Sequence, residues 1–158
     1  MKRLTIAQPF LFAVFPILTL LAANVDFVRP VEALIPLIAV AVATAVLLGL
    51  ATWLLKDLDG AAIAISLFWF LFFFYRRLLA SIGGPGGGRE RLVFLGCLLL
   101  LGLTVAVAIK MRGRLGALAS IVNVAGLALV AVPLLVIASS LRPRASGSSL
   151  LSSAPIAA

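Results

Sequence analysis

The sequence has little of what an active site or a water-exposed surface requires. Histidine is absent, Cys97 is the single cysteine, and only five of the 158 residues are Asp or Glu. Charged residues make up 11% of the chain, against about 25% in a typical soluble domain. So few charges cannot solvate a globular surface, which excludes a soluble fold. Intrinsic disorder is also excluded, because it requires low hydrophobicity and high charge. The shortage of histidine, cysteine and carboxylates predicts that the chain is not an enzyme and holds no metal or other cofactor.

The chain consists mainly of apolar residues, which make up 64% of it. They form five uncharged runs with charged residues at the borders, and none of the runs alternates as a membrane β-strand does. A helix satisfies its backbone hydrogen bonds internally, as lipid requires, so the sequence predicts an all-α, polytopic helical membrane protein. The transmembrane helical domain is expected over residues 1–141, with about five spans at residues 4–25, 33–55, 60–77, 92–109 and 118–138.

The third run is the weakest candidate span. It has 16 uncharged residues between Asp59 and Arg76, which reach only about 24 Å as a helix. We expect it to span, because Arg76 and Arg77 can extend their side chains toward the headgroups. A re-entrant or interfacial segment is the alternative, and it would leave four spans. The orientation stays open, because five spans divide the Lys and Arg residues almost equally between the two sides.

Two segments have the composition of linkers. Residues 81–91 form a glycine-rich loop around Gly83–Gly88, which separates three expected spans from two. Residues 142–158 are rich in Ser, Ala and Pro, which predicts a disordered tail or a linker to a further domain. The first run has a basic flank like that of a signal peptide, but its length and the bulky Leu21 before the best cleavage point favour an uncleaved span.

Small residues recur at four-residue spacing in two of the expected spans. Ala41, Ala45 and Gly49 follow this spacing in the second span, and Gly102 and Ala106 follow it in the fourth. Small side chains let helix backbones approach closely. We therefore expect these residues to pack against other helices of the chain or, alternatively, against a second copy in a homo-oligomer.

Asn123 is the one amide deep in an expected span. An amide in lipid needs a hydrogen-bond partner, so we expect Asn123 to join helices, with a substrate contact as the alternative. No Asp, Glu, Lys or Arg lies in the middle of any expected span. Ion-coupled transporters carry such groups as proton relays or substrate partners, so their absence argues against a pump or a proton-coupled carrier.

Basic residues give the chain a formal net charge of +8 and gather at the borders of the spans. In a membrane protein such residues set topology and meet anionic headgroups. Membrane lipids are therefore the expected partners, and nucleic acid is not. The expected headgroup contacts come from two loops and are Arg76, Arg77, Arg89, Arg91, Lys110, Arg112 and Arg114.

A series of short motifs resembles the start of a family of bacterial membrane proteins. The family joins an N-terminal multi-span region to a sulfatase-like domain of the alkaline phosphatase superfamily, and lipoteichoic acid synthases have a similar architecture. The resemblance implies a multi-pass region of the bacterial cytoplasmic (inner) membrane. Its motifs, between Pro9 and Arg142, are PFLFAVFPIL at 9–18, Asn24, EALIPL at 32–37, KDLDGAAIAIS at 56–66, Phe72-Phe73, Asn123-Val124 and Pro133-Leu134-Leu135.

The chain departs from that family in two ways. It has Phe74-Tyr75-Arg76-Arg77 after the phenylalanine pair, where the family tends to have Ser-Tyr-Gly-His. It also stops where the family's catalytic domain would begin, so the expected metal-binding Asp and the nucleophilic Ser or Thr have no counterpart. The resemblance therefore implies the membrane architecture and no hydrolase or transferase activity.

These features predict an integral membrane anchor or scaffold region without catalytic activity of its own. A sulfatase-like domain or protein is its expected partner. One alternative is a small oligomeric transporter, flippase or channel subunit, suggested by the packing motifs and by prolines within three spans. The other alternative is an accessory subunit of a larger membrane complex.

Overall fold

The computed structural model describes residues 6–25, 27–84, 86 and 88–140. This part of the chain is helical and has no strand, which confirms the predicted all-α fold. A short 3-10 turn precedes the second of five α-helices. The elements are α2 (Ala7–Ala23), η1 (Pro30–Ala33), α3 (Leu34–Leu55), α4 (Leu58–Ser81), α5 (Arg89–Lys110) and α6 (Gly116–Ser140).

The chain is a multi-pass helical membrane protein. Among the described residues, four helical segments are long and apolar enough to cross a membrane: Val31–Leu55, Leu58–Ser81, Arg89–Lys110 and Gly116–Ser140. The remaining helix, α2, has 17 residues, at the lower limit of roughly 17–25 for a span. The marginal helix is therefore the first one, and the third expected span is a long helix.

Helix α4 extends beyond its predicted span at both ends. It has 24 residues, about 36 Å, and continues past Arg76 and Arg77 to Ser81. Because α5 already begins at Arg89, the connection between the two helices is shorter than the glycine-rich loop predicted at 81–91. The reason is that a helix does not end at its first charged residue when the long arginine side chains can reach water from the last turns.

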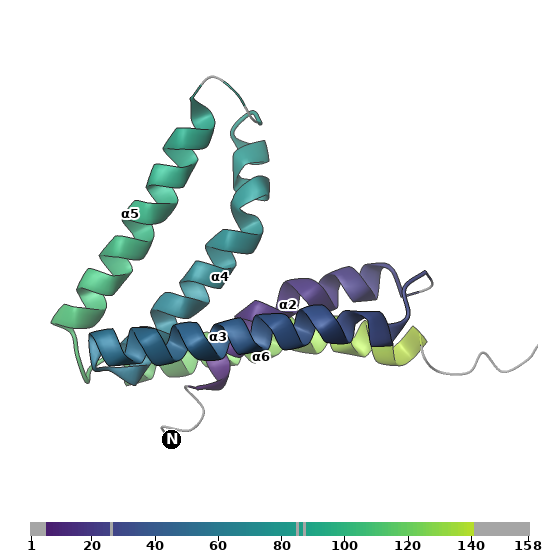
Figure 1. Cartoon of the computed structure of the whole chain (residues 1–158), viewed down its shortest axis with the longest axis horizontal. Coiled ribbons are helices and arrows are strands. Elements are labelled where there is room, and N and C mark those ends of the chain that lie inside the picture. The colour runs from purple at the N-terminus through teal and green to yellow at the C-terminus, as the bar shows by residue number, and fades with distance from the viewer. Residues whose placement is uncertain (1–5, 26, 85, 87, 141–158) are drawn as a thin grey trace, which may run out of the picture.

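Helix α4 contacts α2, α3, α5 and α6, and the shortest α-helix, α2, packs between α3 and α6. Helix α2 contacts α3, α4 and α6, whereas α3 and α6 flank it without contacting each other in the described part of the chain. Helices α4 and α5 form a hairpin that leaves this group at a steep angle (Figure 1). Helix α5 packs on α4 and touches α3 over only a few residues, so most of its surface is exposed.

Helices α2 and α6 run parallel and make the most extensive contact between two elements. Gly126 of α6 lies against Leu11 and Phe12, whose side chains would be 3.2 Å from a Cβ atom at that position. Toward the C-terminal ends of both helices, Leu21 and Ile137 share a buried cluster. Because lipid offers no hydrophobic driving force between helices, this close approach supplies the van der Waals contact that holds them together.

The α3–α4 corner brings the base of the hairpin to the group around α2. Lys56 ends α3 in the left-handed conformation, with a φ of 51°, and Asp57 begins the next helix. The Asp57 Oδ2 atom accepts a hydrogen bond from the backbone N–H of Gly60 at 3.1 Å, which caps the N-terminus of α4. This tight corner leaves little freedom in where α4 starts.

Several hydroxyl groups within the helices are satisfied locally, whereas the buried Thr52 Oγ1 atom has no partner in the described chain. The hydroxyls of Thr44 and Ser66, both buried, donate to backbone carbonyls four residues earlier, at 2.7 and 2.8 Å. Thr19 and Thr104 make the same bond at 2.9 Å. Each hydroxyl can therefore lie in an apolar environment without a partner from another helix.

Gly60 should tolerate no side chain, because a Cβ atom there would lie 2.8 Å from the Cβ of Ala108 on α5. The alanine methyl has no rotamer to adopt, so α5 itself would have to move. We expect Gly60→Ala to lower the free energy of unfolding by about 1–3 kcal/mol, measured by detergent-denaturant titration in mixed micelles. The matched control is Gly49→Ala, which meets no atom within 4 Å and should be neutral or stabilising.

The alternation of the five helices predicts which connections share a side of the membrane. With Cys97 replaced by alanine, single cysteines at Lys56 and Arg112 should react with a membrane-impermeant maleimide from one side. A cysteine at Ser81 should react from the other side. If α4 were re-entrant, Ser81 and Lys56 would react from the same side and Arg112 from the opposite one.

Candidate functional site

The predicted packing residues lie mostly on the outer surface of the molecule. Ala41 is half-buried on α3, whereas Ala45, Gly49, Gly102 and Ala106 are exposed. A Cβ atom at either of the two glycines would meet nothing within 4 Å. These four exposed residues therefore do not join the described helices of this chain, and their faces are open to lipid or to a second copy.

Asn123 lies on the face of α6 that packs against α2, and α2 carries a second buried amide, Gln8. Gln8 stands three to four residues before Leu11 and Phe12 on α2, and Asn123 stands three residues before Gly126 on α6. Because the helices are parallel and Gly126 contacts those two side chains, the two amides lie at the same level of the same interface. The structure therefore places Asn123 and Gln8 at one helix–helix interface, without a direct hydrogen bond between them.

Both amides are buried without a hydrogen-bond partner. Gln8 is 0% exposed and Asn123 is 5% exposed. Neither polar atom of the Gln8 amide has a partner in the described chain, and neither does the Asn123 Oδ1 atom. Leaving a buried donor or acceptor unpaired costs about 1–3 kcal/mol, so each amide has a strong preference for the other or for a shared water.

Sequence reasoning missed Gln8, because it lies close to the N-terminal border of its apolar run. The signal that could have found it is an amide between Ala7 and Pro9, with no charged neighbour on either side. An uncharged polar side chain flanked by apolar residues is expected to be buried against another helix rather than left in lipid.

The seven predicted headgroup residues lie in two groups, toward the two ends of α5, and all seven are exposed. At one end, the last turns of α4 and the first turn of α5 bring together the arginine rim, which we define as Arg76, Arg77, Arg89 and Arg91. The guanidinium Nη1 of Arg89 donates to the Gly83 carbonyl at 3.1 Å. At the other end lie Lys110, Arg112 and Arg114, so the predicted headgroup contacts form two separate groups.

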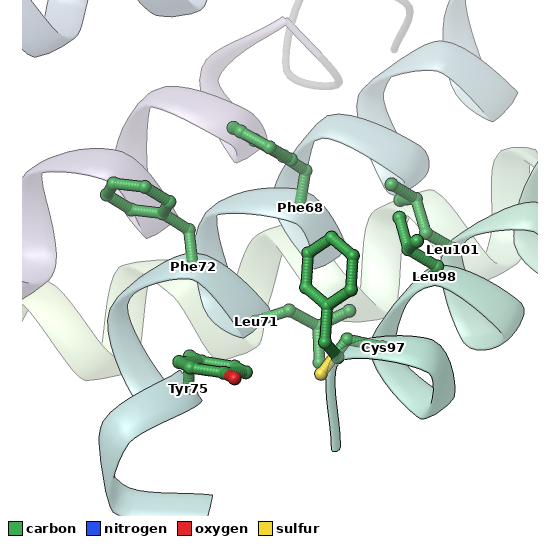
Figure 2. A pocket seen from close by; sticks show the side chains of 8 residues that line it. Phe68, Leu71, Phe72, Tyr75, Cys97, Leu98 and Leu101 are labelled. Carbon is green, nitrogen blue, oxygen red and sulfur yellow. The ribbon is translucent and has the colours of Figure 1, made fainter. Parts of the chain in front are cut away.

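An apolar hollow of about 370 Å³ lies between α4 and α5; we call it the α4–α5 groove. Figure 2 shows that the side chains around it come from both helices. Only Tyr75 and Cys97 among its lining residues carry a side-chain heteroatom, so the groove suits a hydrocarbon chain. Its lining consists of Phe68, Leu71, Phe72 and Tyr75 from α4 and Phe94, Cys97, Leu98 and Leu101 from α5.

Two contacts, one toward each end of the groove, fix the spacing of α4 and α5. Above it, the Tyr75 hydroxyl donates to the backbone carbonyl of Glu90 at 3.2 Å, which ties the last turns of α4 to the first turn of α5. Below it, Gly60 lets the base of α4 approach Ala108 of α5. The described residues contain no cluster of three or more His, Cys, Asp or Glu side chains that could hold a metal ion.

The two buried amides should be energetically coupled. We expect one water to bridge the two amides, so Gln8→Leu and Asn123→Leu should each lower the free energy of unfolding by removing one of that water's partners. The double variant should then lose less than the sum, with a coupling energy of about 0.6–1.7 kcal/mol in a double-mutant cycle. Thr44→Val combined with Asn123→Leu is the additive control, since the Thr44 hydroxyl bonds within its own helix. Additivity of the Gln8 and Asn123 effects would contradict the pairing.

Comparison of the chain with protein-family models, with curated proteins and with solved structures gives no match. The multi-pass helical architecture is therefore established by the helices of this chain alone. The amide pair, the arginine rim and the α4–α5 groove are likewise features of this chain. Any function has to follow from their geometry and chemistry.

Proposed function

We propose that this chain is an integral membrane anchor or scaffold region of the bacterial cytoplasmic membrane, with no catalytic activity of its own. One observation carries the proposal: none of the charged side chains that the structure describes is buried. Charges stand at the helix ends, and the buried polar groups are amides, hydroxyls and the Trp69 indole. Groups that relay protons or bind ions within a membrane are usually charged and face the interior of the helix bundle.

The packing of the helices supports the same proposal. The contacts that join α2 to α6 and α4 to α5 are close approaches of glycine and alanine, at Gly126 and at Gly60 with Ala108. Such contacts favour a fixed arrangement, because small residues give a large van der Waals contact with little freedom to repack. A fixed arrangement suits an anchor or scaffold, which holds another domain or protein at the membrane.

The proposed partner is a sulfatase-like domain or protein, as the resemblance of the motifs between Pro9 and Arg142 implies. That partner would carry the catalytic groups, and this chain would hold it at the membrane. Chemical crosslinking in native membranes followed by mass spectrometry tests this part of the proposal. A sulfatase-like protein among the crosslinked products is expected, and products formed only with other copies of this chain would contradict it.

A small oligomeric transporter, flippase or channel subunit is the second candidate. Two observations favour it: the α4–α5 groove is open toward lipid, and the exposed small residues Gly49 and Gly102 leave room for a second copy. A flippase moves lipids along such a hollow. The two candidates therefore differ in whether the protein conducts or translocates anything.

Flux measurements separate the two candidates. For an anchor, liposomes containing the purified chain should release no more dye, and scramble no more fluorescent lipid, than liposomes containing an unrelated membrane protein. Leu98→Trp fills the α4–α5 groove without changing any charge and is the matched variant. Scrambling by the wild-type chain that this variant abolishes would overturn the anchor proposal in favour of a flippase.

A further inference from the structure

We propose that the α4–α5 groove is a binding site for one anionic phospholipid, with an acyl chain in the groove and the phosphate at Arg76 and Arg91. The anchor proposal does not assign a ligand, and this inference does not depend on it, since a transporter could hold the same lipid. What carries it is the position of an apolar hollow directly beneath a group of four arginines.

The groove has the size and surface of an acyl-chain site. Its volume of about 370 Å³ lies within the range of ligand pockets, which begins at about 300 Å³. Along α4 it extends from Phe68 to Tyr75, and along α5 from Phe94 to Leu101, a length of about 10 Å on each helix. The aromatic rings of Phe68 and Phe72 stack with their centroids 6.0 Å apart, so one wall is a continuous aromatic surface.

The groove is preformed, which lowers the cost of filling it. The Tyr75–Glu90 hydrogen bond near one end and the Gly60–Ala108 contact beyond the other fix the spacing of the two helices around the hollow. Its walls come from helices, which hold side chains more precisely than loops do. A ligand therefore has little of the protein to reorder when it binds.

The helix register places arginines at the upper end of the groove. Arg76 stands four residues after Phe72, and Arg91 stands three residues before Phe94, so each is one turn beyond a groove residue on the same side of its helix. Both side chains are exposed and available to a ligand. Arginine binds phosphate oxygens through its planar fork of N–H donors, which can donate two parallel hydrogen bonds to one lipid phosphate.

Charge at this end is complementary to an anion. The four arginines of the rim face a single acidic residue, Glu90, in the turns that they occupy. Basic pockets between membrane helices bind anionic headgroups for this reason. An apolar hollow that is capped at one end by positive charge fits an anionic phospholipid, in which a phosphate is joined to hydrocarbon chains. A zwitterionic lipid would bring its own positive charge to the same arginines.

Native mass spectrometry of the purified full-length chain tests this site. The chain is released from detergent in the presence of equimolar phosphatidic acid and phosphatidylcholine with identical acyl chains. We expect one phosphatidic acid to remain bound in preference to phosphatidylcholine. Arg76→Gln with Arg91→Gln should lower this preference by about 25-fold, since each arginine near a lipid phosphate contributes about a factor of five.

Arg112→Gln with Arg114→Gln is the matched control, because it removes the same charge at the opposite end of α5. It should leave the preference for phosphatidic acid unchanged. Equal losses in the two double variants would show that net charge alone attracts the lipid and would overturn the proposed site. So would equal retention of phosphatidic acid and phosphatidylcholine by the wild-type chain.

Photocrosslinking locates the acyl chain without any substitution. Phosphatidic acid with a diazirine in its acyl chain should react mainly with peptides that contain residues 68–75 and 94–101. Crosslinks spread evenly over all exposed helices would contradict the site. This result is independent of the flux measurements. A chain that scrambles lipid can still bind phosphatidic acid in the groove, and an anchor that scrambles nothing can still lack the binding site.

Discussion

The parallel packing of α2 against α6 is the contact on which the rest of the structure depends. Helix α2 is the shortest α-helix, and it contacts α3, α4 and α6. Gly126 brings the backbone of α6 within van der Waals distance of Leu11 and Phe12, and the Gln8–Asn123 level lies one turn away. In lipid, where apolar contact with a helix gains nothing over contact with an acyl chain, this close fit is what makes α2 part of the molecule.

Helix α4 connects that central group to the exposed hairpin, and its aromatic residues serve both. Trp69 is 6% exposed and clusters with Ala13 and Ile65, on the side of α4 that meets α2 and α3. Phe68 and Phe72, on neighbouring positions of the same helix, line the α4–α5 groove. One aromatic segment therefore supplies both the buried contact and the wall of the proposed lipid site, which explains why it is so rich in phenylalanine.

The distribution of polarity fits a protein that works through its position in the membrane. Most of the buried hydroxyls bond within their own helices, two buried amides lie at one interface, and charges gather at the helix ends. An anchor needs a stable arrangement and a fixed depth, and an anionic lipid bound at the arginine rim would contribute to both. The lipid would join α4 to α5 between the Tyr75–Glu90 hydrogen bond and the Gly60–Ala108 contact.

The sequence by itself determined the all-helical, multi-pass architecture and the gathering of basic residues at the helix ends. Long apolar runs are sufficient for this, because each helix satisfies its own backbone in lipid. The tertiary structure decided which faces meet: Gly60 and Gly126 make close contacts while Gly49 and Gly102 are exposed, and Gln8 and Asn123 are both buried. Sequence could not reveal this, because helices that are apolar on every side show no periodicity to mark the packed face. Only the fit of particular small and large side chains selects it.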